Sequence, residues 1–536
     1  MTSGDWNTDA ARLYASGKTD AAVALVMRAA QRAGDDVVEV FSVARSLGLY
    51  GQFDRALYYG QRAIELTPDN PVCWRAVHDL YSRAGRHAEM LASAKRSVVA
   101  CPKSSGLWMD VAAPQLDLGD SEQALESVRH AIACEPMSWI AAQAQLMAHN
   151  YLWPPDTEAI KAALAHAEVC ARLDAEKLPI APNPKGPTNR PARDKPLVVF
   201  VSPDCYVHSV AFFLLPLLEH ADPARATVWV FYTGVKQDAV TARIKAACQR
   251  LGGDLLLSAP DEVFEPIKTL TQRHGPIDIA VDLAGLTPNN SVNCFARGIA
   301  PRQATYLGYP NSTGQPSIGV RIVDAITDPV GGLTDGLGPE RLVRLPGCFL
   351  CYQPPAIAPA VAPSLTASGS GGGITFGSFN NACKLNHATV DLWSRVLAAV
   401  PNSRLLLKCA KDVSANLALY NRVDIALDTL GYTGTATTCE ALYMGVPVLT
   451  CMPAEALHAG RVSASLLTAA GVPELITTSV DEFVHTAASL AGDRPRLATY
   501  RATLRARLLA SPLCDAKTFA RNWFDAILDE QSWVRP

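Results

Sequence analysis

A strand, a loop of glycine and threonine, and the start of a helix follow one another near residue 430. Residues 424–428 read DIALD, which predicts a buried strand, and residues 429–438 read TLGYTGTATT. Backbone N–H groups at the start of a helix lack partners within the helix, and the helix dipole favours an anion there. Threonine hydroxyls add further donors. We therefore interpret this loop as a diphosphate site, with donors that include Thr435, Thr437 and Thr438.

Glu440 stands in the first turn of the helix that follows this loop. A carboxylate there suits the helix dipole, and it could also accept hydrogen bonds from the hydroxyls of a ribose. The same pattern fits a simpler structure, in which Thr437 or Thr438 caps the helix and Glu440 completes the cap. The residues alone leave both interpretations open.

A second loop follows the strand predicted at residues 374–378. It brings Asn380, Asn381 and Lys384 to a strand end. A lysine in that place could neutralise the charge on a leaving diphosphate. The alternative is an ordinary solvated lysine, which is the usual environment of this residue type.

His208 belongs to a third loop, which follows the strand predicted at residues 197–202. A histidine at the carboxyl end of a strand could act as an acid or base, or could orient a substrate. A structural role is an equally good interpretation.

Two groups of short apolar segments supply the strands that would position these loops. Their runs of Val, Leu, Ile and Phe are typical of strands buried on both faces, and they alternate with helical patterns, which predicts parallel sheets. Two such sheets leave a cleft at the carboxyl ends of their strands. The first group is 197–202, 227–233, 254–258 and 278–283, and the second is 374–378, 404–408, 424–427 and 446–450.

The first third of the chain has a period of 34 residues. Glycine, proline and tryptophan each recur in one register, and this period is typical of tetratricopeptide repeats, which are pairs of antiparallel helices. The pattern predicts repeats that begin near residues 3, 37, 71 and 105, and a less regular fifth copy from Trp139 to Leu178. Such arrays present an extended concave surface that usually binds protein or peptide. The register is carried by Gly17, Gly51, Gly85 and Gly119, by Pro68, Pro102 and Pro136, and by Trp6, Trp74 and Trp108.

These patterns together predict an all-α tetratricopeptide solenoid followed by an α/β part with two Rossmann-like lobes. Two stretches rich in proline, glycine and polar residues predict linkers between the parts. The expected segments are the repeats at 1–178, a linker at 179–196, an N-terminal lobe at 197–352, a flexible linker at 353–373 and a C-terminal lobe at 374–536.

Composition excludes several classes of function. The net charge of -3 does not indicate a nucleic-acid-binding protein, and no run of eighteen apolar residues predicts a membrane helix. The polar N-terminal residues do not resemble a signal sequence, so we expect a cytoplasmic protein. Cys348 and Cys351 form a CxxC pair, but no second pair or histidine has the spacing of a zinc site. We therefore expect no metal and a structural role for this pair.

Several motifs, in order along nearly the whole chain, resemble the O-GlcNAc transferase/SPINDLY family, and more closely its SPINDLY branch. After the repeats these motifs are SPDCYVHSV at 202–210, LGYPNSTG at 307–314, FGSFNN at 376–381, PNSR at 401–404 and CEALYMGVP at 439–447. The resemblance implies a GT-B fold and a metal-independent, inverting transfer of a sugar from a nucleotide to Ser or Thr of proteins held by the repeats. UDP-GlcNAc is the favoured donor and GDP-fucose the alternative. No cofactor is implied, and a homo-oligomer is left open.

The resemblance also assigns roles to residues. Lys384 matches a lysine that stabilises the departing diphosphate, and His208 matches an active-site histidine. The donor-binding positions implied by the resemblance are Asn381, Thr435, Thr437, Thr438, Glu440 and His458.

Three positions depart from the family pattern. Leu286 replaces a His or Tyr that is frequent in the family, and GIAP at 298–301 replaces an RPAP motif. Only residues 409–423 connect two predicted strands where the family has several tens of residues more, including the loop that recognises the base. Two hypotheses therefore remain: an active transferase, or a repeat scaffold whose transferase part is silent.

Overall fold

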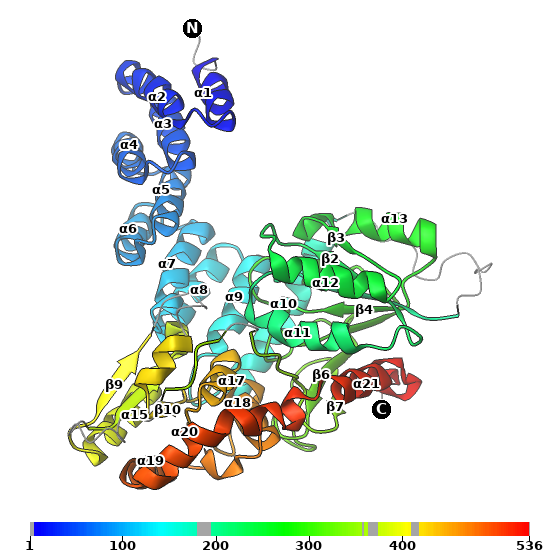
Figure 1. The fold of residues 1–536 in the computed structure, drawn as a ribbon. Helices are drawn as coiled ribbons and strands as arrows, with labels where there is room; N and C mark the ends of the chain where they lie inside the picture. Colours follow the sequence, from blue (N-terminus) through cyan, green and yellow to red (C-terminus); the bar gives the residue numbers. More distant parts are fainter. Residues whose placement is uncertain (1–4, 179–193, 356–357, 363–372, 409–416, 535–536) are drawn as a thin grey trace. The chain divides into compact units, whose positions relative to one another are not determined.

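The protein is described by a computed structural model that covers residues 5–178, 194–355, 358–362, 373–408 and 417–534. Contacts between residues divide the chain into two compact units, Met1–Ala148 and His149–Pro536. The first unit is entirely helical, and the second contains two parallel sheets (Figure 1). The predicted fold class is confirmed.

The helices of the first unit follow the predicted period. The first helices of successive repeats begin at residues 37, 71, 105 and 139, and the glycine between two paired helices adopts a positive φ, for example 74° at Gly51. Glycine is needed at such a turn because a Cβ atom disfavours that conformation. The helices are α1 Asp5–Ala15, α2 Thr19–Ala33, α3 Val37–Leu49, α4 Phe53–Leu66, α5 Pro71–Arg83, α6 His87–Ala100, α7 Ser105–Asp117, α8 Ser121–Cys134 and α9 Trp139–His149.

The last helix of the repeat region, α10 (Thr157–Ala175), belongs to the second compact unit. It packs against α14 (Val292–Ala296), and Asn293 donates a hydrogen bond to Asp174. The compact units therefore divide before α10, whereas the sequence pattern of the repeats ends near residue 178. The predicted linker at 179–196 lies mostly outside the described residues.

The first sheet has seven parallel strands in the order β3-β2-β1-β4-β5-β6-β7. The four strands predicted from the sequence are present, and three further strands extend the sheet beyond β4. Every residue of the central strand β1 is buried, which explains its unbroken apolar sequence. The strands are β1 Leu197–Ser202, β2 Thr227–Tyr232, β3 Leu255–Leu257, β4 Ile279–Asp282, β5 Arg302–Thr305, β6 Val320–Asp324 and β7 Arg341–Leu345, and the longer helices between them are α11 Ser209–His220, α12 Ala239–Arg250 and α13 Phe264–His274.

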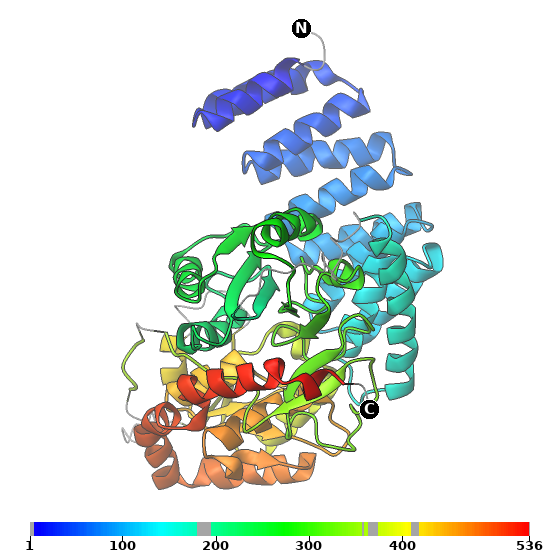
Figure 2. The same cartoon turned by 90° about the vertical axis from the view of Figure 1, so that its right-hand side faces the viewer.

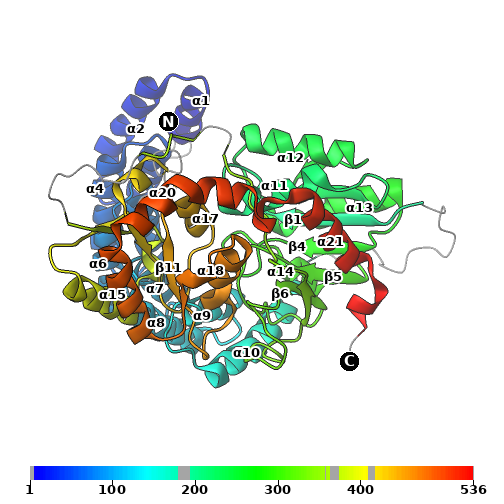
Figure 3. The same ribbon diagram turned by 60° about the horizontal axis from the view of Figure 1, so that its bottom comes forward.

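The second sheet has five parallel strands in the order β12-β11-β10-β8-β9. It includes the four predicted strands and adds β12. Figure 3 shows α20 running past α17, with which it is in contact. The strands are β8 Thr375–Ser378, β9 Arg404–Leu407, β10 Ile425–Leu427, β11 Val448–Cys451 and β12 Ile476–Thr477, and the helices are α15 His387–Ala399, α17 Ala436–Tyr443, α18 His458–Ala469, α19 Val480–Gly492 and α20 Arg494–Leu509.

The last long helix, α21 (Ala516–Leu528), returns to the first sheet, where it contacts α11 and β7 (Figure 2). Its Trp523 is fully buried, with its ring 5.4 Å from that of Phe200 and 5.6 Å from that of Tyr306. The C-terminal segment therefore completes the core of the N-terminal lobe. Among the described residues, no helix is both long and apolar enough to cross a bilayer.

Replacing Trp523 by Ala should destabilise the second unit by about 3–5 kcal/mol, the usual cost of removing a large buried aromatic side chain. Urea unfolding followed by circular dichroism measures this cost. Arg521→Ala, an exposed change on the same helix, is the matched control. A loss below about 1 kcal/mol for Trp523→Ala would show that α21 does not stabilise the first sheet.

Candidate functional site

A buried carboxylate organises the loop between β10 and α17. Asp428 is 3% exposed and accepts four hydrogen bonds. Its Oδ1 accepts from the backbone N–H groups of Gly434 at 2.8 Å and Thr429 at 2.9 Å, and from Nδ2 of Asn380 at 3.0 Å. Its Oδ2 accepts from the hydroxyl of Thr450 at 2.8 Å. These bonds fold the loop around one side chain and join it to β8 and β11.

The start of α17 carries no side-chain cap. Thr435 is its N-cap residue and makes no capping hydrogen bond. The hydroxyl of Thr437 instead donates to Oδ1 of Asn380 at 2.6 Å, and that of Thr438 pairs with the hydroxyl of Ser463 at 2.8 Å. The capping alternative therefore does not hold for these threonines. The backbone N–H groups in the first turn of α17 therefore have no side-chain cap, and uncapped N–H groups at a helix start suit an anion.

Gly434 is required for this arrangement. A Cβ atom at this position would lie 2.5 Å from the hydroxyl oxygen of Thr438 and 2.8 Å from that of Thr437. Any other residue would push the two threonines away from the helix start.

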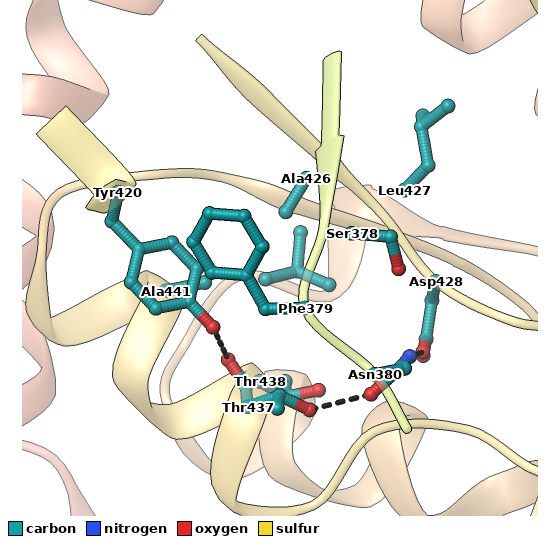
Figure 4. A pocket seen from close by; sticks show the side chains of 11 residues that line it. Ser378, Phe379, Asn380, Tyr420, Ala426, Leu427, Asp428, Thr437, Thr438 and Ala441 are labelled. Atoms are coloured by element: carbon teal, nitrogen blue, oxygen red, sulfur yellow. Dashed lines mark hydrogen bonds between the residues drawn. The ribbon is translucent and has the colours of Figure 1, made fainter. Parts of the chain in front are cut away.

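A small pocket lies beside these threonines, at the carboxyl ends of β8 and β10 (Figure 4). Its volume of about 20 Å³ is enough for one water molecule. The rings of Phe379 and Tyr420 form an apolar wall, with centroids 4.5 Å apart, and the hydroxyl of Tyr420 donates to the carbonyl of Thr437 at 3.0 Å. The lining residues are Ser378, Phe379, Asn380, Tyr420, Ala426, Leu427, Asp428, Thr437, Thr438, Ala441 and Val448.

Lys384 reaches the same loop from the other side. Its Nζ donates to the carbonyl of Thr433 at 2.8 Å and lies 4.0 Å from the centre of the Tyr432 ring. Burial lowers the pKa of this amine to about 8, so it is mostly protonated at neutral pH. Lys384, which follows β8, thus contacts the ten-residue loop 429–438 that carries Thr437, as expected for two residues of one site.

A turn that follows α9, the first helix of the irregular fifth repeat, supports this loop, a role that was not predicted from the sequence. The ring of Tyr151 stacks on that of Tyr432 with centroids 5.1 Å apart, and Trp153 packs against Gly431. Asn386 donates to the carbonyls of Tyr151 at 3.1 Å and Leu430 at 2.9 Å. Tyr151 and Trp153 lie between the two helices of the fifth repeat, and no local pattern there indicates the contact.

Of the two neighbouring asparagines, it is Asn380 whose side chain enters the site. Asn380 is 6% exposed and bridges Asp428 and Thr437. The family resemblance implies Asn381 as the donor-binding amide, but Asn381 is exposed, and its backbone carbonyl accepts a hydrogen bond from the backbone N–H of Lys384. A donor contact from Asn381 stays a prediction.

Glu440 is 7% exposed in α17. Burial raises the pKa of its carboxyl to about 7, and the opposing charge of Lys408 limits this rise. The group is therefore close to half ionised at neutral pH. Carboxyl groups whose pKa is raised this far above the usual value are frequent in binding and catalytic sites.

His208 lies in the other lobe, at the start of α11. Its Nδ1 accepts from the backbone N–H of Val210 at 3.4 Å and is 3.6 Å from Oδ1 of Asp204. Burial lowers the pKa of the imidazole, and Asp204 partly opposes this effect. With 38% of its side chain exposed, His208 can reach solvent or a ligand. Its catalytic role stays a prediction.

His458, the first residue of α18, connects the two lobes. Its Nδ1 is hydrogen-bonded to Asp328, and Arg321 donates to the same carboxylate at 2.9 Å. Although burial acts in the opposite direction, Arg321 and His458 hold the pKa of Asp328 well below its usual range. The second lobe is thus tied to the first beside the loop of residues 429–438. Donor binding by His458 stays a prediction.

Metal ligands are not grouped anywhere in the described part of the chain, where no three His, Cys, Asp or Glu side chains could share an ion. Cys348 and Cys351 are both buried. The thiol of Cys348 accepts a hydrogen bond from the hydroxyl of Ser465 at 3.3 Å, which links the pair to the interface of the two lobes.

The shortened connection at 409–423 is only partly described. Residues 409–416 lie outside the described residues, and the rest includes Tyr420, which forms the wall of the pocket. Leu286 is buried at 4% exposure, so it fills space in the position where the family has a polar ring.

Comparison with known proteins identifies relatives. Residues 417–523 match Glycosyl transferase family 41. The protein named "Probable UDP-N-acetylglucosamine--peptide N-acetylglucosaminyltransferase SPINDLY" is 40% identical over 367 residues in Hordeum vulgare and 37% identical over 430 residues in Oryza sativa. These matches cover 62% and 74% of this chain, and 38% and 45% of the two relatives, so the chain spans less than half the length of the curated relatives it matches.

A solved structure covers almost the whole chain. A mutant of the Thermobaculum terrenum O-GlcNAc transferase superposes with a TM-score of 0.78 at 27% identity, over 93% of this chain and 98% of that protein. A protein of the SEC type from Arabidopsis thaliana is 29% identical over 280 residues, which is 46% of this chain and 28% of that protein.

The amine of Lys384 should titrate near pH 8, and Tyr432→Leu should lower its pKa by about half a unit, because the aromatic face stabilises the charged form. The pH dependence of acetylation by acetic anhydride, read by mass spectrometry, measures both values. Tyr432→Phe keeps the ring and is the control. Titration of Lys384 near pH 10.4, as in an exposed lysine, would contradict the buried position.

Proposed function

Because this chain belongs to the O-GlcNAc transferase/SPINDLY family of glycosyltransferases and is nearer to the SPINDLY branch, we propose that it transfers a sugar from a nucleotide donor to Ser or Thr hydroxyls of proteins. The observation that carries the proposal is the uncapped start of α17 beside Lys384, because both supply positive charge where a diphosphate would lie. UDP-GlcNAc is the favoured donor, in agreement with the names of the relatives, and GDP-fucose is the alternative.

In the proposed reaction, the hydroxyl of the acceptor attacks the anomeric carbon from the face opposite the diphosphate. A single displacement of this kind inverts the configuration at that carbon. The bond between the sugar and the diphosphate breaks, and negative charge grows on the leaving oxygen. Lys384 would turn from the carbonyl of Thr433 toward that charge, and the hydroxyls of Thr435 and Thr437 would donate to the phosphates. These fixed donors would take the place of a metal ion.

Other residues would bind the donor and the acceptor. Glu440 would accept hydrogen bonds from the ribose, with Asn381, Thr438 and His458 nearby in the donor site. His208 would orient the acceptor or take its proton. The repeats would hold a segment of the acceptor protein.

A silent scaffold is the second candidate, and one observation favours it. The pocket beside α17 is far smaller than a nucleobase, because Phe379 and Tyr420 fill its wall. A donor must therefore displace Tyr420 or place its base outside this pocket. In a silent scaffold the repeats would bind proteins and the lobes would bind no nucleotide.

Labelled UDP-GlcNAc or GDP-fucose, mixed with the purified protein and a cell lysate, tests the activity. We expect labelled acceptor proteins with one of the two donors. No labelling with either donor, or with a panel of other nucleotide sugars, combined with no heat on titration of UDP or GDP at millimolar concentration, would favour the scaffold.

Lys384→Ala should lower turnover about 100- to 1,000-fold and change the affinity for nucleotide less than about 3-fold, because the lysine acts on charge that develops in the transition state. Steady-state kinetics and calorimetry with UDP measure the two effects. Lys517→Ala, which removes an exposed lysine of α21, is the control. An equal loss of turnover and affinity would argue for simple binding by Lys384.

Nucleotide binding should weaken as the pH falls below about 7, because protonation of Glu440 removes an acceptor for the ribose hydroxyls. The raised pKa sets the direction: the carboxylate is available above it and is lost below it. Calorimetry at pH 6 and pH 8 should show a difference of about 10-fold in affinity. Glu440→Gln should remove most of this difference, and an unchanged pH dependence in that variant would exclude the role.

A further inference from the structure

The first compact unit contains a large cavity, separate from the candidate site beside α17. Its volume is about 640 Å³, and it is lined by the first helices of three successive repeats, α3, α5 and α7, with Gly60 and Met90 from their paired helices. A volume of this size lies within the range of ligand-binding pockets. The cavity crosses three repeats, which suits an extended ligand.

A buried histidine with one unused nitrogen lines this cavity. His78 is 1% exposed, and its Nδ1 is 2.8 Å from Oδ2 of Asp110. Its Nε2 is buried and has no hydrogen-bond partner among the described residues. Because the carboxylate of Asp110 accepts from Nδ1–H, the neutral ring presents Nε2 as an acceptor. Such an orphaned buried acceptor is unusual in a folded protein, and the other ring nitrogen of His78 holds Asp110, the carboxylate next to Arg75.

Arginine side chains supply positive charge to the same cavity. Arg75 keeps 62% of its side chain exposed, and its Nε is 3.8 Å from Asp110. It lies across the start of α7, where a Cβ atom at Gly106 would be 3.3 Å from its Nη1. Arg45 is exposed on α3 and also lines the cavity. By contrast, Arg83 is held by the carbonyl of Gly48 at 2.9 Å and by Asp79 at 3.6 Å.

Apolar side chains complete the lining. Leu49 is 58% exposed and Val72 is 60% exposed, and both belong to the cavity. Large exposed aliphatic residues next to arginines suit a ligand that alternates apolar and acidic side chains.

We propose that this cavity binds an acidic side chain of an extended protein segment. Arg75 and Arg45 bind the carboxylate, and Leu49 and Val72 contact the apolar side chains of the segment. Guanidinium groups bind carboxylates through paired, charge-assisted hydrogen bonds, which gives the subsite its preference. The proposal rests on the protein-binding role of the repeats proposed above and does not require sugar transfer.

Fluorescence anisotropy with the full chain tests the subsite without any sugar donor. The probes are three labelled peptides, acetyl-Ala-Leu-Xaa-Leu-Ala-amide, in which Xaa is Glu, Gln or Lys. We expect the Glu peptide to bind about 10-fold more tightly than the Gln peptide, and the Lys peptide to bind most weakly. Equal binding of the three peptides, or a preference for Lys, would overturn the proposal.

Variants assign the effect to the cavity. Arg75→Ala and Arg45→Ala should each reduce the preference for Glu over Gln, and the double variant should abolish it. Lys95→Ala removes an exposed positive charge from α6 outside the cavity and should leave the preference unchanged. An equal effect of Lys95→Ala would mean that long-range charge alone attracts the peptide, which contradicts a built subsite.

Two further measurements keep the result independent of folding and of catalysis. Circular dichroism of each variant checks that the helices are intact, since the arginines are exposed. Lys384→Ala should bind the Glu peptide as the unchanged protein does, even where transfer is lost. A protein that transfers no sugar and still prefers the Glu peptide would reject the proposed transfer and keep this subsite.

Discussion

The geometry of the loop between β10 and α17 depends on the buried carboxylate of Asp428. Its two oxygens accept from the backbone at Thr429 and Gly434, and from side chains on β11 and just after β8. A loop of glycine and threonine would otherwise have many conformations of similar energy. Four hydrogen bonds to one carboxylate select a single conformation, in which the hydroxyls of Thr437 and Thr438, in the first turn of α17, bond to Asn380 and Ser463 and do not cap the helix.

Positive charge is placed around this loop with little solvent to weaken it. Lys384 is held by one carbonyl and one aromatic face, and in the described part of the chain no carboxylate forms an ion pair with it. Asp328 instead forms an ion pair with Arg321 in its own lobe and a hydrogen bond with His458 of the other lobe. Of the acidic groups near the loop, Asp428 accepts four hydrogen bonds. The pKa of Glu440 is raised, so its neutral form is favoured. An anion that enters this site would therefore find hydrogen-bond donors and a positive charge, and little repulsion from negative charge.

Much of the architecture was predictable because it depends on local patterns. The period of 34 residues set the starts of the helices, and apolar runs marked eight strands correctly. The strands β5 to β7 were missed because arginine and glutamine interrupt them: Gln303 and Arg321 are buried through hydrogen bonds that no sequence pattern reveals. The sequence also does not reveal which of Asn380 and Asn381 turns its side chain into the site. That depends on the backbone conformation after β8, which directs the side chain of Asn380 toward Asp428. The contact of Tyr151 with Tyr432 joins residues 281 positions apart and has no local signal.

The turn from Asn150 to Trp153 sets a limit on how the protein can be shortened. Judged by sequence, these residues look like the middle of a worn repeat, which could be removed together with the helices before it. In the fold the ring of Tyr151 stacks on Tyr432, its carbonyl accepts from the amide of Asn386, and Asn150 donates to Tyr309, so this turn supports the loop before α17. A fragment that begins after α10 would therefore lose part of this loop's own scaffold, and any loss of function in it would not report on the helical repeats alone.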